Sequence, residues 1–245
     1  MLLKIFTLIL LTKMTLALAI AFTNSMPPYY IEKDERGIEL EIIKASFKEK
    51  GFDIKEIRNV NYKDAVKLLN SNVVNGVVDN LTNSIYEGSE VLQSNQTINY
   101  IDCAVALKNS LINLGKKESF SSHSVWAFKS AKDVLGEEFK KSVEVNSNYS
   151  EDFDQELQTK VLLGKRIDII ISDKNVFMYQ FTRNHPAQRI DQLVFYPVSK
   201  KTPRNIKFKD SFYLKSFNEG LEIIKRNGIY DKILKSYHGQ YFTEC

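Results

Sequence analysis

The chain has 245 residues, of which 43% are hydrophobic and 26% charged, so it can bury a core and does not have the composition of a disordered protein. Its 34 basic and 30 acidic residues leave a net charge of only +4, and no run of five or more like charges occurs. This pattern does not support the basic footprint of a nucleic-acid-binding protein. The length suits one large domain or two of ordinary size.

Residues 1–19 have the features of a secretory signal peptide. A short basic start precedes an apolar run over residues 5–11, and Ala17 and Ala19 form a small-x-small cleavage site. Lys13 interrupts the apolar stretch and makes it a poor membrane span, although an uncleaved anchor is the alternative. We therefore expect a cleaved leader and a periplasmic protein.

Export places the two cysteines where a disulfide can persist. Cys103 lies in an apolar, strand-like run over residues 101–107, and Cys245 is the last residue. A bond between them would hold the C-terminal tail against the body of the protein. Two free thiols, one buried and one terminal, are the alternative, and spacing alone leaves both open.

Strand and helix patterns alternate along the chain, which predicts an α/β protein with parallel strand pairing. The predicted strands are 20–23, 52–57, 75–78, 99–108, 125–128, 143–145, 166–171 and 193–198. The predicted helices are 39–50, 62–70, 131–141, 153–163 and 176–182, followed by two closing helices.

These elements form two successive α/β blocks of similar make-up. We expect a first lobe from residues 20–106 plus 199–245 and a second lobe from residues 107–198. The two chain crossings, near residues 104–108 and 197–201, would then act as a hinge. A cleft between two lobes is a preferred ligand site, and hinge closure over the ligand is its usual motion.

The C-terminal segment carries the clearest helical pattern. Leu214, Phe217, Leu221 and Ile224 recur at spacings of three and four, the apolar stripe of an amphipathic helix. Gly228 then ends this helix, and a second short helix follows. The whole segment reads FNxGLxxxxxxGxYxxIxxxY.

This pattern resembles the closing helices of periplasmic solute-binding proteins of the amino-acid-receptor type, bacterial extracellular solute-binding protein family 3. Further similar stretches span nearly the whole mature chain, in the family's order: 27–29, 37–42, 75–78, 124–139 and 164–173. The resemblance implies a two-lobed type II periplasmic-binding-protein-like fold with two hinge crossings. It also implies a monomer without cofactor or enzymatic activity, which delivers an amino-acid-like or other small polar solute to an inner-membrane ABC permease.

One departure from the family pattern concerns the ligand carboxylate. Amino-acid-binding members carry an arginine just after the turn that follows the third strand, and its planar fork clamps the carboxylate. Glu87 stands at that position here, and no Lys or Arg occurs between Asp79 and Ala106. The sequence therefore does not support a standard amino-acid receptor.

Four candidate ligand-binding residues come from the first lobe. Tyr29 follows two prolines at the end of the first strand, where it can stack on a ligand or pack between the lobes. Asn80, Leu81 and Thr82 follow the third strand, where they can hydrogen-bond a ligand or form an ordinary turn.

Two more candidates come from the second lobe. Tyr149 precedes a predicted helix and is a stacking candidate, as the resemblance implies. Asp173 ends the apolar strand over residues 169–171, where its carboxylate suits a ligand amine but also suits a helix N-cap.

Other chemistries find no support in the sequence. The three histidines are far apart and form no metal-binding pair, and no nucleophile elbow, Walker loop or dinucleotide-binding motif is present. Two alternatives stay open. One is an enzyme, because some proteins that resemble this family are exported dehydratases, and the other is a sensory module that reports a ligand to a membrane partner.

Overall fold

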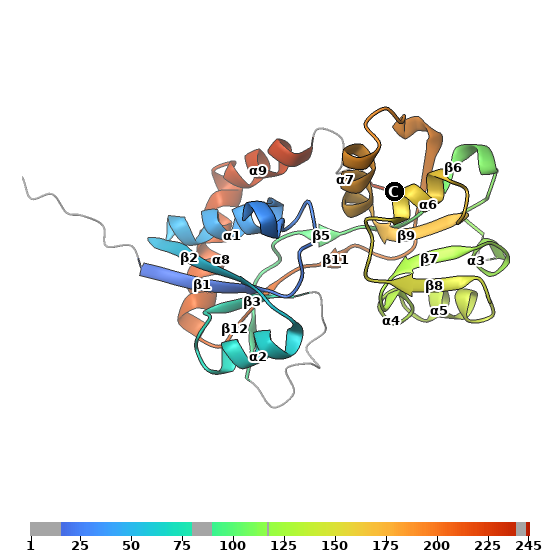
Figure 1. The fold of residues 1–245 in the computed structure, drawn as a ribbon. Helices are drawn as coiled ribbons and strands as arrows, with labels where there is room; N and C mark the ends of the chain where they lie inside the picture. The colour runs from blue at the N-terminus through green and yellow to red at the C-terminus, as the bar shows by residue number, and fades with distance from the viewer. Residues whose placement is uncertain (1–15, 80–89, 117, 239–243) are drawn as a thin grey trace, which may run out of the picture.

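The computed structural model describes residues 16–79, 90–116, 118–238 and 244–245, and it consists of two α/β lobes connected by crossing segments (Figure 1). Each lobe is built on a five-stranded sheet. The two-lobed α/β architecture predicted from the sequence is therefore confirmed. None of the helices in the described ranges is long and apolar enough to span a bilayer.

The sheet of the first lobe has the strand order β2-β1-β3-β12-β4. β3 is central. β1 lies between β2 and β3 and pairs in parallel with both, while β12 returns from the C-terminal segment and pairs antiparallel with β3 and β4. The strands are β1 (Leu16–Phe22), β2 (Phe52–Asn59), β3 (Gly76–Val78), β4 (Leu92–Gln93) and β12 (Ile206–Phe208). The helices are η1 (Glu32–Asp34), α1 (Ile38–Glu49), α2 (Tyr62–Asn70), α8 (Ser211–Arg226) and α9 (Ile229–His238).

The sheet of the second lobe has the order β10-β6-β9-β7-β8, in which β7, β8 and β9 are parallel and β6 is antiparallel to both of its neighbours. The strands are β6 (Asp102–Leu107), β7 (Val125–Phe128), β8 (Tyr149–Asp152), β9 (Ile169–Asp173) and β10 (Leu193–Pro197). The helices are η3 (Lys108–Ser110), α3 (Glu118–Ser122), α4 (Ala131–Val134), α5 (Glu137–Glu144), α6 (Gln158–Leu163), α7 (Lys174–Asn184) and η4 (Ile190–Gln192).

Two short antiparallel strands, β5 (Asn99–Tyr100) and β11 (Thr202–Pro203), connect the lobes. The first crossing, predicted near residues 104–108, therefore lies earlier in the chain. The predicted boundary after residue 106 falls inside β6, whose residues are all buried between β9 and β10 in the second sheet. The second crossing, predicted over 197–201, ends next to β11.

Several helix and strand boundaries in the structure differ from those predicted from the sequence. The strand expected over residues 143–145 is the end of α5, because Phe139 and Val143 lie one helical turn apart and both pack into the core. Gly136, with a φ of 90°, separates α4 from α5 where one helix was predicted. At the N-terminus, the predicted leader boundary after Ala19 falls inside β1, and the leader itself stays a prediction.

The closing helix α8 packs against α1 at a very short distance. A Cβ atom added to Gly220 would lie 1.9 Å from the backbone oxygen of Ser46 in α1. Ser46 is itself fixed, because its hydroxyl donates to the carbonyl of Ile42 at 2.7 Å. Only glycine allows the two helices to approach this closely, which explains the glycine of the closing pattern.

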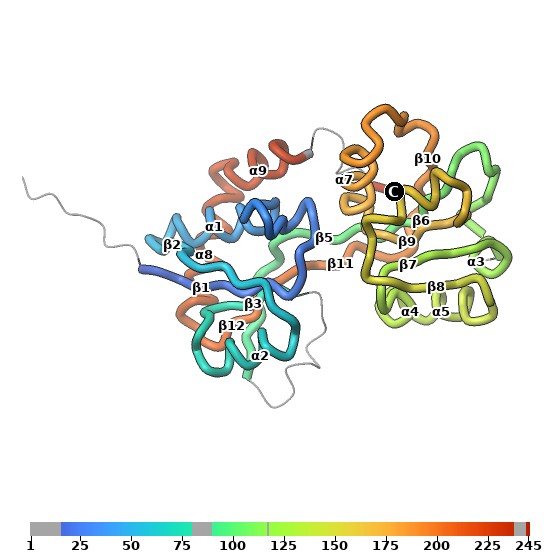
Figure 2. Tube along the Cα trace, viewed as in Figure 1, coloured from blue at the N-terminus to red at the C-terminus, as the bar shows by residue number. Residues whose placement is uncertain are grey.

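A disulfide between Cys103 and Cys245 forms a third connection between the lobes. Cys103 lies in β6 of the second lobe, and Cys245 ends the tail that follows α9, which packs on α1 in the first lobe. Figure 2 shows the C-terminus beside β6 and β9, away from α9. The ammonium of Lys174 donates to the carbonyl of Glu244 at 2.5 Å and holds the same tail.

We predict that the Cys245→Ser substitution lowers the free energy of unfolding by about 2–5 kcal/mol, because it releases a loop of 142 residues in the unfolded chain. Urea unfolding with and without a thiol reductant measures this. Reductant should lower the stability of the wild type to that of the variant and leave the variant unchanged. A wild type whose stability does not respond to reductant would contradict the prediction.

We predict that Gly220→Ala destabilises the first lobe by at least about 1–3 kcal/mol, because the new methyl group overlaps the α1 backbone. The matched control is Glu222→Ala in the same helix, which removes an exposed side chain and should cost about 0.5 kcal/mol or less. Denaturant unfolding compares the two variants. Equal stability would show that the helices can move apart at little cost.

Candidate functional site

Tyr29 lies in the loop that follows β1, where the carboxyl ends of the parallel strands of the first sheet meet. Its carbonyl accepts from the backbone N–H of Glu39 at 3.0 Å, at the start of α1. Gly37 has a φ of 137°, and a Cβ there would lie 2.3 Å from the Tyr29 oxygen. The glycine thus lets α1 begin directly against this loop and orient Tyr29, whose side chain is 1% exposed.

Asp173 ends β9 in the second sheet and is the N-cap of α7. Its Oδ1 accepts from the backbone N–H groups of Asn175 at 2.9 Å and Val176 at 3.0 Å. Its Oδ2 accepts from the backbone N–H of Ile101, next to β5, at 2.8 Å. One carboxylate therefore fixes the end of a strand, the start of a helix and the crossing segment.

The structure brings Tyr29 and Asp173 together across the two lobes. The phenol hydroxyl of Tyr29 donates to the carboxylate, with distances of 3.0 and 3.1 Å to its two oxygens. The same hydroxyl accepts from the Nδ2 of Asn175 at 2.8 Å. Two residues predicted separately as ligand contacts are thus partners of each other in a buried junction.

Arg204 occupies the other side of this junction, and sequence reasoning missed it. Its guanidinium carbon lies 4.8 Å from the ring centre of Tyr100, which is in turn 4.8 Å from the ring centre of Tyr29. It also donates to the backbone carbonyl of Asp79, at the end of β3. A basic residue therefore reaches the end of the third strand from the returning crossing segment, far from the positions searched in sequence.

The charge of Arg204 is matched inside the protein. Its Nη2 lies 3.3 Å from the carboxylate of Glu39, and both side chains are buried. Thr97 donates a further hydrogen bond to Glu39 at 2.7 Å. A buried, hydrogen-bonded ion pair of this kind keeps the guanidinium in place and leaves its charge compensated.

Two buried carboxyl groups face each other beside the crossing. Asp102 of β6 lies directly opposite Asp173 of β9 in the antiparallel register. Burial and the charge of Asp173 raise the pKa of Asp102 to about 7, and burial raises the pKa of Asp173 to about 6 against its backbone N–H donors. Ionising both groups at neutral pH therefore costs stability.

Two buried polar atoms of this junction lack hydrogen-bond partners in the part of the chain that the structure describes: the Oδ1 of Asn175 and the Nε of Arg204. The first is a neutral acceptor directly beside Tyr29. Buried polar atoms of this kind are uncommon in native structures and indicate a water or ligand group.

Comparison with known protein families identifies the group of proteins to which this chain belongs. The family model of bacterial extracellular solute-binding proteins, family 3, matches residues 18–240. The chain belongs to this family. A comparison with curated proteins finds no match.

Solved structures similar to this solute-binding protein share its fold at low sequence identity. An ancestral arginine-binding protein bound to arginine is 17% identical, with a TM-score of 0.66 over 91% of this chain and 98% of that one. A Streptococcus pneumoniae ABC uptake transporter substrate-binding protein with bound histidine is 16% identical, with a TM-score of 0.68 over 92% and 93%. The GluR0 ligand binding core with L-glutamate is 12% identical, with a TM-score of 0.71 over 92% and 100%.

Tyr149 does not join the other predicted residues of the solute-binding protein. It begins β8 in register with Val125, which in turn pairs with Ile169 at the start of β9. Asp173 lies at the opposite, carboxyl end of that parallel sheet. Tyr149 instead packs on Phe139 and donates to Glu151 at 2.7 Å, because residues 149–152 form a strand rather than the turn that was predicted.

The side chain of Glu151 accepts hydrogen bonds from backbone N–H groups in the turn after β7. Its carboxylate accepts from the N–H groups of Ser130 at 2.8 Å and Lys132 at 2.9 Å. Nearby, Phe153 follows the carboxyl end of β8 and is 78% exposed, and the helix predicted from residue 153 begins only at Gln158 in α6. Residues Asn80, Leu81, Thr82 and Glu87 lie outside the described residues.

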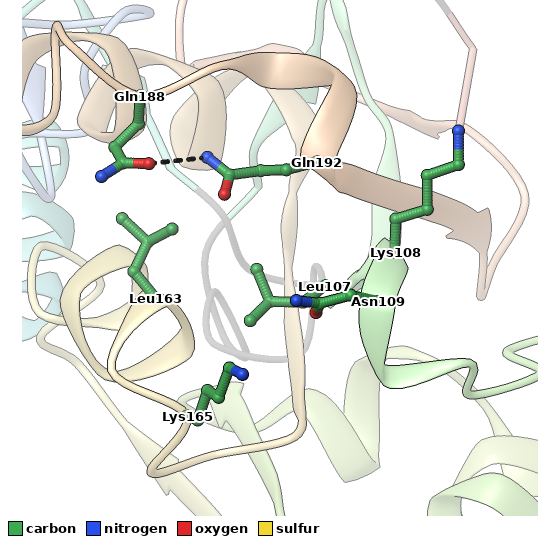
Figure 3. Close-up of a pocket in the computed structure, with 7 residues that line it drawn as sticks. All are labelled: Leu107, Lys108, Asn109, Leu163, Lys165, Gln188 and Gln192. Carbon is green, nitrogen blue, oxygen red and sulfur yellow. Dashed lines mark hydrogen bonds between the residues drawn. The ribbon is translucent and has the colours of Figure 1, made fainter.

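Two surface cavities lie away from the junction. One of about 400 Å³ has a floor of Leu107 and Leu163, with the hydrogen-bonded pair Gln188 and Gln192 at its rim (Figure 3). The other, of about 520 Å³, lies between Arg36 of the first lobe and α7. Within the described ranges, no group of three or more potential metal-ligating residues occurs.

We predict that stability falls as the pH rises from about 4 to about 7, because the folded protein keeps protons on Asp102 and Asp173 that the unfolded chain has lost. Asp102→Asn should make this dependence shallower, by up to about 4 kcal/mol between pH 4 and pH 8. Urea unfolding at pH 4.5, 6 and 7.5 measures it. The same slope in wild type and variant would contradict the prediction.

Proposed function

We propose that this chain is an exported protein that captures a small polar solute between its lobes and delivers it to an ABC permease of the inner membrane. The observation that carries the proposal is the convergence of strand ends from both sheets. Tyr29 follows β1, Asp79 follows β3 and Asp173 ends β9, and all three take part in the junction beside the crossing strands. Ligands of α/β sheets bind outside such carboxyl ends.

Capture is a binding event without covalent chemistry. Rotation of the lobes about β5 and β11 would open and close the space in front of the junction. The proposed contacts are Tyr29 and the residues Asn80, Leu81 and Thr82 of the segment after β3, with Asp173 behind Tyr29 as the partner of its hydroxyl. Tyr149 is left out of this set, because it lies at the far end of the second sheet.

The charged groups argue for a solute that differs from those of the similar structures. Those proteins were solved with arginine, histidine and L-glutamate, which all carry an α-amine and an α-carboxylate. In this chain Glu87 replaces the expected carboxylate-binding arginine. Arg204, the basic residue at the end of β3, is already paired with Glu39. We therefore propose a polar solute whose binding does not depend on clamping a carboxylate.

We predict that one chemical class in a panel of amino acids, polyamines, organic acids, sugars and short peptides raises the melting temperature of the exported, disulfide-bonded protein. A ligand at about 100 times its dissociation constant stabilises the folded state by about 2.7 kcal/mol, a shift of a few degrees. Thermal unfolding followed by circular dichroism measures it.

Tyr213→Phe is the matched control for this panel. It removes a tyrosine hydroxyl on α8 of the first lobe, where the ring packs on Phe52 away from the junction, so the variant should show the same ligand shift as the wild type. No shift with any class would contradict the proposed function. Loss of the shift in the control variant would contradict the proposed location of the site.

A further inference from the structure

We propose that the Tyr29 hydroxyl binds the Asp173 carboxylate at the position that a ligand amine would otherwise take. Tyr29 thereby restricts the interlobe site to solutes without a cationic group. This inference rests on the proposed solute-binding function and names the charge class of the solute. Tyr29 would then determine the specificity of the site for the charge of the solute.

The first step of the argument is the number of donors around the carboxylate. An ionised carboxylate offers about four acceptor positions. Backbone N–H groups of Ile101, Asn175 and Val176 take three of them, at 2.8 to 3.0 Å. The hydroxyl of Tyr29 takes the fourth and lies almost equally far from both oxygens. No acceptor position is left for an ammonium group.

The second step is that Tyr29 comes from the opposite lobe. Its loop is fixed by the start of α1, whereas Asp173 is fixed by α7 and the crossing segment. An amine bound at Asp173 would displace the hydroxyl and break the contact between the lobes. Closure and amine binding therefore compete for one carboxylate, and the phenol needs no solute to make its bond.

The third step concerns what the junction offers instead. The Oδ1 of Asn175 is buried and unpartnered in the described part of the chain, next to the Tyr29 hydroxyl that its Nδ2 contacts. This amide oxygen is an uncharged acceptor, which suits a hydroxyl or amide N–H. The carboxylate of Glu151 likewise holds the two N–H donors after β7 that a ligand anion could otherwise use. Both observations favour a neutral, hydrogen-bonding solute.

The test compares Tyr29→Phe with the wild type, using putrescine and L-lysine as amine probes in isothermal titration calorimetry on the full, disulfide-bonded protein. The variant keeps the ring but frees one acceptor position of Asp173. We expect it to bind the amine probes at least about tenfold more tightly than the wild type, since hydrogen bonds to charged groups are strong. Tyr30→Phe, which alters the neighbouring tyrosine stacked on Phe22, should not change binding.

The double variant Tyr29→Phe with Asp173→Asn should lose the gain, since asparagine keeps the N-cap of α7 but not the charge. Equal amine affinity in wild type and Tyr29→Phe would overturn the inference, as would a gain that persists in the double variant. Asp173→Asn alone provides a second test. Wild-type amine binding that falls tenfold or more in this variant would also overturn the inference.

The two proposals fail on different readouts. The proposed function fails if no class in the solute panel stabilises the wild type. The inference about Tyr29 fails if amine affinity does not differ between variants, whatever the panel shows. A wild type that binds a cationic solute through Asp173 would leave the solute-binding function standing and remove Tyr29 as the residue that restricts charge.

Discussion

The carboxylate of Asp173 is the interaction on which the arrangement of the lobes depends. It ends β9, caps α7, holds the backbone of Ile101 beside the crossing and accepts the hydroxyl of Tyr29 from the other lobe. Each of these bonds alone is modest, but a buried carboxylate without them would be very unfavourable. The surroundings of one side chain therefore link the secondary structure of the second lobe to the position of the first.

Two other charged groups are likewise paired within the protein, one in the junction and one in the second sheet. Arg204 pairs with Glu39, and Glu151 binds backbone donors at the end of β7. In a receptor for amino acids, such groups would be left for the ligand to pair with. Here the internal pairs fix the strand ends, and the amide oxygen of Asn175 is a neutral buried acceptor without a partner among the described residues.

The fold was predictable where the pattern was local, and the site only in part. The amphipathic stripe of α8 and the apolar run of β9 predicted their elements, because burial on one face determines both. The contact between Tyr29 and Asp173 joins residues 144 positions apart, and no local pattern encodes that. Arg204 was missed because it arrives from the returning crossing, and Tyr149 was misplaced because a short edge strand resembles a turn.

In the proposed closing motion the disulfide would not oppose rotation of the lobes, because of where it is attached. Cys103 is only three residues beyond Tyr100 of β5, so the tail joins the second lobe close to the crossing strands. A link attached near a rotation axis changes little in length when the two bodies rotate, whereas one attached at the rim would resist opening. The third connection would therefore restrict mainly the unfolded chain, and the proposed rotation would fall on β5 and β11.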